Sequence, residues 1–175
     1  GRMDVLIRAV MSALLTSHGL RSNVEVILHL QGGPGPNRRL KFVGSELRGF
    51  HAEERSVAGL IAKAIREPSP AIGQWIERTP GLYDGGGNLG HTLTEWKDSV
   101  FIRLDADAER LWKQNEPIPQ QSVPNEQTIA FLLSDDQPLE TDEGIPRSIG
   151  STWLQGHHAI AICHFLLDEG VQLNL

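Results

Sequence analysis

The spacing of apolar residues predicts helices along much of the chain. The clearest pattern lies between Glu53 and Arg66, where Val57, Leu60 and Ile61 begin a stripe that recurs with the period of a helix. Acidic residues at the start of this segment place negative charge at the positive end of the helix dipole. Helices are predicted over residues 3–17, 53–66, 92–99, 106–114 and 157–168.

Short apolar runs, several of them rich in β-branched residues, predict strands between these helices. The run at 24–30 suits a strand buried on both faces, and the run at 128–133 suits a strand in the middle of a sheet. Strands are predicted over residues 24–30, 40–43, 100–104, 128–133 and 147–151. Stretches with Gly and Pro predict mostly loop over residues 31–37, 67–91 and 116–125. This alternation of strands and helices favours an α/β sandwich around a mainly parallel sheet.

The composition bounds the class of protein. With 175 residues, 39% of them hydrophobic, the chain suits one compact domain with a core of ordinary size. Its net charge of −6 supplies no overall basic field for nucleic acid, so any RNA site must be a local patch. The single cysteine, Cys163, excludes an internal disulfide and favours a reducing compartment, the cytosol. The apolar runs are too short for a membrane span or a secretory signal.

Three features that suggest chemistry are weak when their context is considered. The glycine-rich segment 85–90 matches G-x-G-x-x-G, but Pro80 and Gly81 break up the residues before it, which favours a flexible loop over a dinucleotide site. The histidines of the last helix are at 157, 158 and 164, but His157 and His164 are seven residues apart, too far for ordinary i, i+4 chelation, and no carboxylate completes a metal set. Cys163 lies in the apolar stripe of that helix, where we expect an inert core thiol.

Charged residues gather at the breaks between elements in the first half of the chain. Arg2 and Asp4 begin the first helix, Arg21 follows it, and Glu46 and Arg48 follow the second strand. Such residues usually form a solvated surface. If these ends converge, arginine side chains can bind phosphates bidentately while one carboxylate accepts a proton.

Five segments resemble, in order, the motifs of the archaeal tRNA pseudouridine N1-methyltransferases, a family of the SPOUT superfamily. They are GRMDVL at 1–6, SHGLR at 17–21, KFVGSELR at 41–48, EER at 53–55 and TPGLY at 79–83. The C-terminal segment 154–168 fits the last helix of that family. The resemblance covers nearly the whole chain, and five motifs in the correct order are far more specific than any single one.

The resemblance implies a single SPOUT methyltransferase domain over residues 1–175, with a deep trefoil knot over about 128–175 and a homodimer packed through the knot. Loops of the knot would hold S-adenosylmethionine, with no metal. The implied cofactor-binding residues are Leu133, Ser134, Asp135, Ile149, Gly150, Ser151, Leu154 and Ala159. Family members carry a further strand before the first motif, so we expect one N-terminal strand to be missing.

The implied reaction is N1-methylation of a pseudouridine in the T-loop of tRNA. Asp4 is the candidate proton acceptor, with Glu46 as the alternative, and Arg2 is a further candidate catalytic residue. The candidate contacts to phosphates or to the displaced base are Arg2, Arg21, Arg48, Arg55 and Tyr83. Ser134 stands where the family has Gly, and Ala159 where it has Cys. Two alternatives stay open: methylation of rRNA, a nucleoside or another small acceptor, and a knotted RNA-binding module that has lost catalysis.

Overall fold

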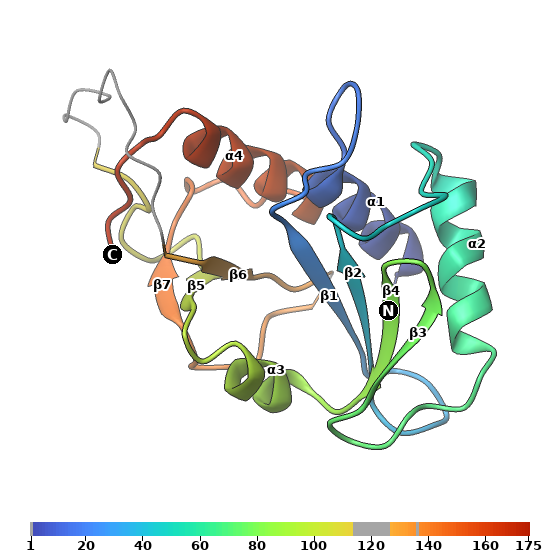
Figure 1. Cartoon of the computed structure of the whole chain (residues 1–175). Helices are drawn as coiled ribbons and strands as arrows, with labels where there is room; N and C mark the ends of the chain where they lie inside the picture. Colours follow the sequence, from blue (N-terminus) through green and yellow to red (C-terminus); the bar gives the residue numbers. More distant parts are fainter. Residues whose placement is uncertain (1, 114–126, 136) are drawn as a thin grey trace. The chain divides into compact units, whose positions relative to one another are not determined.

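A computed structural model describes residues 2–113, 127–135 and 137–175 of the chain. The chain divides into two compact units, Gly1–Trp96 and Lys97–Leu175, each with its own sheet (Figure 1). The loop predicted at 116–125 lies outside the described residues.

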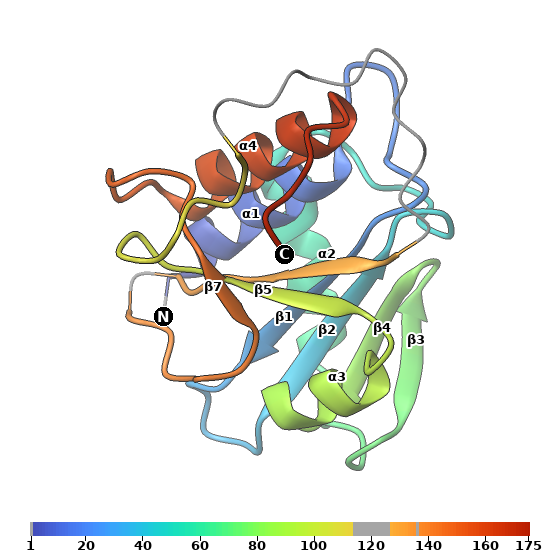
Figure 2. The ribbon, with the colours of Figure 1, turned by 90° about the vertical axis from the view of Figure 1, so that its left-hand side faces the viewer.

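The first unit packs helices against a four-stranded sheet. Its helices are α1 (Met3–Leu14), α2 (Glu54–Ile65) and α3 (Leu89–Glu95), and its strands are β1 (Glu25–Leu30), β2 (Arg38–Val43), β3 (Trp75–Thr79) and β4 (Leu82–Gly86). The strand order is β1-β2-β4-β3, and α1 and α2 cover one face of the sheet (Figure 2). Leu40, Phe42 and Leu82 are fully buried beneath these two helices.

The prediction of a mainly parallel sheet is wrong for this unit. Every neighbouring pair in the four-stranded sheet is antiparallel. The connections explain the difference: residues 31–37 join β1 to β2, and Pro80 and Gly81 alone join β3 to β4. Parallel neighbours need a crossover of a dozen or so residues, which these short loops cannot provide. The first strand is also an edge strand in which only Leu28 is buried, so it is not covered on both faces.

The hairpin of β3 and β4 replaces the loop predicted at 67–91. Its turn has Gly81 at φ +81, a backbone conformation that suits glycine. Within β4, a Cβ on Gly85 would lie 2.6 Å from the Trp75 ring, and one on Gly86 would lie 2.4 Å from the Pro70 carbonyl. The glycines therefore serve close packing within a strand. The G-x-G-x-x-G segment runs from the end of β4 into the start of α3, but the start of that helix is closed by its own Asn88–His91 capping box.

The second unit is built on a three-stranded parallel sheet with the order β6-β5-β7. Its elements are β5 (Val100–Leu104), β6 (Ile129–Leu132), β7 (Ile145–Arg147) and α4 (Gly156–Asp168). Ile102 and Leu111 form its core together with Cys163 and Leu166 of α4. The central strand is β5, so the prediction that 128–133 lies mid-sheet is wrong.

The helix predicted at 106–114 is absent from the described residues 106–113. This segment instead runs beside the chain that follows β7: Leu111 donates its N–H to the Ser148 carbonyl at 2.8 Å, and Ser148 donates to Glu109 at 2.7 Å. These bonds to a distant part of the chain satisfy the backbone groups that a local helix would have used.

Cys163 is 4% exposed, and burial raises the pKa of its thiol to about 12. A thiol that stays protonated is a poor nucleophile, so we expect iodoacetamide to leave the native protein unlabelled near neutral pH. Intact-mass measurement should show one added carbamidomethyl group only after denaturation. Equal labelling rates in the native and denatured protein would contradict the buried position.

Candidate functional site

Three of the sequence motifs meet at one end of the four-stranded sheet. Gly44 donates its N–H to the Val24 carbonyl at 2.9 Å, and Arg48 donates to the Pro80 carbonyl at 3.3 Å. The approach is close enough to require glycine, because a Cβ on Gly44 would lie 2.0 Å from the Arg21 carbonyl oxygen. The segments 17–24, 41–48 and 79–83 are therefore fixed against one another by backbone contacts.

Replacing Gly44 by alanine should destabilise the protein by about 3 kcal/mol, because the new methyl group collides with a backbone carbonyl that cannot rotate away. Gly59 is the matched control, since a Cβ there meets nothing within 4 Å on the exposed side of α2. Gly59→Ala should raise stability by about 0.5–1 kcal/mol. Urea denaturation monitored by circular dichroism measures both changes, and equal effects of the two variants would contradict this packing.

At the same end, the structure joins two predicted site residues. The Tyr83 hydroxyl donates a hydrogen bond to Glu46 Oε1 at 3.1 Å. Hydrogen bonds to Glu77 and then Glu46 raise the pKa of Tyr83 to about 12. Tyr83 is therefore a hydrogen-bond donor at neutral pH, and the two carboxylates act as its acceptors.

The first motif forms a separate charged cluster at the start of α1. Asp4 Oδ2 lies 2.7 Å from Arg2 Nη2 and 2.9 Å from Arg8 Nη2. The hydrogen bond from Arg2, aided by Arg8, lowers the pKa of Asp4 in spite of some opposing desolvation. Asp4 is therefore ionised at neutral pH and ready to accept a proton, although the same arginines reduce its basicity. Sequence reasoning missed Arg8, whose position four residues after Asp4 on a helix was the available signal.

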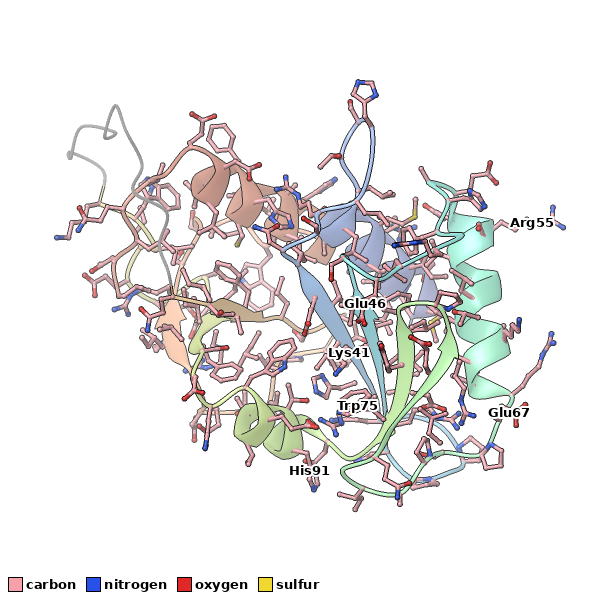
Figure 3. The ribbon with its side chains drawn as sticks, in the orientation of Figure 1. Lys41, Glu46, Arg55, Glu67, Trp75 and His91 are labelled. Carbon is pink, nitrogen blue, oxygen red and sulfur yellow. The ribbon has the colours of Figure 1, made fainter. Side chains whose placement is uncertain are left out.

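The remaining predicted arginines are not gathered at a single point. Arg48 is exposed and donates to the neighbouring Leu47 carbonyl at 2.8 Å, and Arg21 is half-buried beside the Gly44 contact. Arg55 is exposed in the first turn of α2, and its side chain points outward, away from Glu46 (Figure 3). The structure thus brings together Arg2 with Asp4, and Glu46 with Tyr83.

A buried network that sequence reasoning missed holds α3 against the sheet. Arg39 is fully buried and donates to the Gly86 carbonyl at 2.9 Å, to Thr92 Oγ1 at 3.0 Å and to Glu95 Oε1 at 3.2 Å. His29 Nε2 lies 2.9 Å from the same Thr92 oxygen. The guanidinium fork therefore links β2, β4 and α3 through charge-assisted hydrogen bonds.

His29 should make stability depend on pH. Desolvation lowers the pKa of His29 from 6.5 to about 4. The positive charge of Arg39 adds to this effect, and the negative charge of Glu95 partly opposes it. Below pH 6.5 the unfolded chain therefore binds a proton that the folded protein refuses, and stability falls by about 3 kcal/mol as the pH approaches 4. The difference in unfolding free energy between His29→Gln and the parent protein should change across this window. A constant difference would contradict the buried neutral imidazole.

The predicted cofactor residues lie after strands of the parallel sheet. Because β6 and β7 both run parallel to β5, their carboxyl ends meet at one edge, where ligands of parallel sheets bind. Residues 133–135 follow β6, and residues 148–154 follow β7. Of the predicted set, Ala159 is buried in the first turn of α4, and Ser134, Ser151 and Leu154 are exposed.

The loop after β7 has the features of a site read by backbone groups. Gly150 has φ +136, and its carbonyl and N–H both bond to the Ser148 hydroxyl at 3.0 Å. Within the described part of the chain, the N–H and C=O groups of residues 151–154 make no backbone hydrogen bonds. Such groups are free to pair with the donor and acceptor edge of an adenine, so the loop fits a nucleoside cofactor.

The described ranges contain no group of three or more His, Cys, Asp or Glu side chains placed to hold a metal ion. Within the same ranges, none of the helices combines the length and the apolar character needed to cross a lipid bilayer.

Comparison with known proteins gives three findings. Residues 1–170 match the model of a protein family described as "Putative SAM-dependent RNA methyltransferase". The tRNA (pseudouridine(54)-N(1))-methyltransferases of Methanospirillum hungatei and Thermococcus gammatolerans are 34% and 35% identical, covering 93% and 97% of this chain and 80% and 85% of theirs. The crystal structure of Archaeoglobus fulgidus Nep1 bound to S-adenosylhomocysteine has a TM-score of 0.64 at 14% identity, covering 97% of this chain and 71% of that one. This last match shows a shared α/β fold.

Proposed function

The chain belongs to the SAM-dependent RNA methyltransferase family, and on that basis we propose that it methylates N1 of a pseudouridine in the T-loop of tRNA. The substrate assignment is supported by relatives named tRNA (pseudouridine(54)-N(1))-methyltransferases. These relatives align over nearly the whole chain at 31–35% identity.

The cofactor site belongs to the carboxyl edge of the parallel sheet. S-adenosylmethionine supplies an electrophilic methyl group on its sulfonium. Residues 133–135 and 149–151, with Leu154 and Ala159, surround the cofactor, and free backbone groups of 151–154 bind its adenine edge. Asp135 places a negative charge at this edge, which favours a sulfonium cation.

The charged clusters of the first unit bind the RNA and accept the proton from its base. Asp4, held ionised by Arg2 and Arg8, accepts the N1 proton, and Glu46 is the alternative acceptor. Arg21, Arg48 and Arg55 contact phosphates, since the net charge of −6 leaves recognition to local cations. Tyr83, whose hydroxyl donates to Glu46, supports the displaced base.

The finer architecture is also part of the proposal. Both units form one SPOUT domain over residues 1–175, residues from about 128 to 175 form the deep trefoil knot, and two copies pack through the knot as a cytoplasmic homodimer. The match to the Nep1 fold, which covers 97% of this chain, supports a single domain. Exposed apolar side chains of the second unit, Trp153 at 82% and Phe165 at 61%, are consistent with a surface that a second copy covers.

The decisive experiment supplies the purified protein with S-adenosylmethionine and tRNA transcripts carrying pseudouridine or uridine at the T-loop position. Mass spectrometry of nuclease digests should detect 1-methylpseudouridine from the first transcript alone. Pseudouridine nucleoside and rRNA fragments run in parallel test the substrate class. Methylation of those acceptors but not of tRNA would overturn the substrate assignment, and no methylation together with no S-adenosylmethionine binding by calorimetry would overturn the proposed activity.

A further inference from the structure

The face of the four-stranded sheet opposite α1 and α2 carries rings and charges where an apolar layer would be expected. Lys41 pairs directly across from Tyr83, and their side chains share this face with Trp75 from β3. The Lys41 ammonium lies 4.3 Å from the centroid of the Trp75 ring and 5.4 Å from that of the Tyr83 ring. We call Lys41, Trp75 and Tyr83 the ring surface, and Figure 3 shows Lys41 and Trp75 side by side on it.

Trp75 is held in place although it is only half-buried. Its ring lies against Gly85, where a Cβ would come within 2.6 Å, and its Nε1 donates to Glu95 Oε1 at 2.9 Å. Glu95 is in turn fixed by the buried Arg39, whose guanidinium carbon is 4.4 Å from the centroid of the Trp75 ring. An aromatic ring with one fixed orientation loses little entropy when a second flat group stacks on it.

The ammonium of Lys41 has hydrogen-bonding capacity left. In the parts of the chain that the structure describes, Lys41 contacts the two rings and attracts the Glu95 carboxylate, but it donates no hydrogen bond and forms no salt bridge. An ammonium has three N–H donors, so an anionic oxygen placed beside the Trp75 ring would satisfy them.

Acidic groups restrict what can lie at the other end of the ring surface. Glu46 and Glu77 both accept from the Tyr83 hydroxyl, and both are exposed. They repel phosphate and attract N–H groups, so an anion is favoured at Lys41 and a hydrogen-bond donor edge is favoured near Tyr83. A nucleotide has this polarity, with a base whose edge carries N–H donors and a phosphate attached through the sugar.

We propose that the ring surface binds one unpaired nucleotide of the RNA substrate, with its base stacked on Trp75 and its phosphate at Lys41. This inference rests on the proposed RNA methyltransferase function and adds a binding subsite to it. Bases that are not paired stack on aromatic side chains with little sequence preference, which suits a contact that positions the RNA.

The test compares Trp75→Ala with Ile76→Ala, a matched control because Ile76 is 40% exposed on the same strand but faces the opposite side of the sheet. Fluorescence anisotropy with a labelled single-stranded RNA oligonucleotide should show about tenfold weaker binding for Trp75→Ala and little change for Ile76→Ala. Trp75→Phe should retain most of the affinity. With tRNA, Trp75→Ala should raise KM and leave kcat at saturating tRNA near that of the parent protein.

Lys41→Gln tests the surface without removing a ring. It should weaken RNA binding and reduce the slope of log K against log salt by about 0.7, the amount expected for one lost phosphate contact to a single strand. Circular dichroism and S-adenosylmethionine affinity should stay unchanged in all of these variants.

Equal RNA affinities of Trp75→Ala and Ile76→Ala would overturn the inference, as would a Lys41→Gln salt slope equal to that of the parent protein. A change in oligomeric mass for Trp75→Ala by light scattering would assign the surface to contact between copies instead. These failures are distinct from failure of the proposed function, which would appear as absence of tRNA methylation by the unmodified protein.

Discussion

Replacing Arg39 by methionine should lower the free energy of unfolding by about 3 kcal/mol, one of the largest losses expected from a single substitution in this chain. The variant leaves the Gly86 carbonyl and the Thr92 hydroxyl without their buried donor, and it leaves the Glu95 carboxylate without its cation. Because Glu95 is itself 33% exposed, water recovers part of the lost interaction, which keeps the effect near the lower end for a broken buried pair. Urea denaturation at neutral pH measures the change.

Three further variants separate the effect of the hydrogen-bond network from that of a general loss of charge. Arg66→Met removes an exposed arginine just after α2 and should change stability by no more than about 0.5 kcal/mol. Arg39→Lys should recover little, because an ammonium cannot span the three acceptors that the guanidinium fork reaches. Combining Arg39→Met with Glu95→Gln should cost less than the sum of the single changes. Additive effects would show that the ion pair does not couple α3 to the sheet.

The elements that could be predicted from sequence are those whose signal is local. The stripe that begins at Val57 gave α2 to within a residue or two, and β5 was predicted with its observed bounds. The β3–β4 hairpin could not be predicted in the same way. The sequence pattern indicated that its glycines form a loop. In the structure, Gly85 lies in a strand and leaves space for the Trp75 ring, which packs on it. These two residues are ten apart in the sequence. Periodicity carries no information about such a contact.

The contacts of the candidate site also divide into those that sequence spacing indicates and those that it does not. The contact of Asp4 with Arg8 follows from the i, i+4 spacing of a helix. Arg2 instead reaches Asp4 from the extended residue that precedes α1. The contact of Glu46 with Tyr83 joins residues 37 apart, and the motifs marked both residues without indicating that they meet. Arg39 could not be singled out from the sequence. Side chains of a strand alternate between its two faces, and an arginine in such a pattern is expected on the exposed face, whereas the structure buries Arg39 fully.

Replacing Asp4 by asparagine should lower kcat for tRNA methylation by about 10²- to 10⁴-fold, the range associated with loss of a general base. Asparagine keeps an oxygen that can accept from Arg2 and Arg8, so the charged cluster retains part of its geometry, but an amide cannot take the N1 proton. Asp4 is half-buried in the first turn of α1 with 44% of its side chain accessible, and the fold should be unaffected. Single-turnover methylation with saturating cofactor measures the chemical step.

The control is Glu46→Gln, which removes the alternative proton acceptor while keeping an oxygen for the Tyr83 hydroxyl. A large loss for Asp4→Asn with a small loss for Glu46→Gln assigns proton transfer to Asp4, and the reverse result assigns it to Glu46. The pH profile adds a second criterion. Because Arg2 and Arg8 hold the pKa of Asp4 below 3.8, a rate limited by its ionisation should not decline between neutral pH and about pH 5, so a decline that Asp4→Asn abolishes in that interval would contradict the low pKa. Retention of near-parental kcat by both variants would remove side-chain carboxylates of the first unit from the proton transfer and leave Asp4 as the residue that positions Arg2 and Arg8.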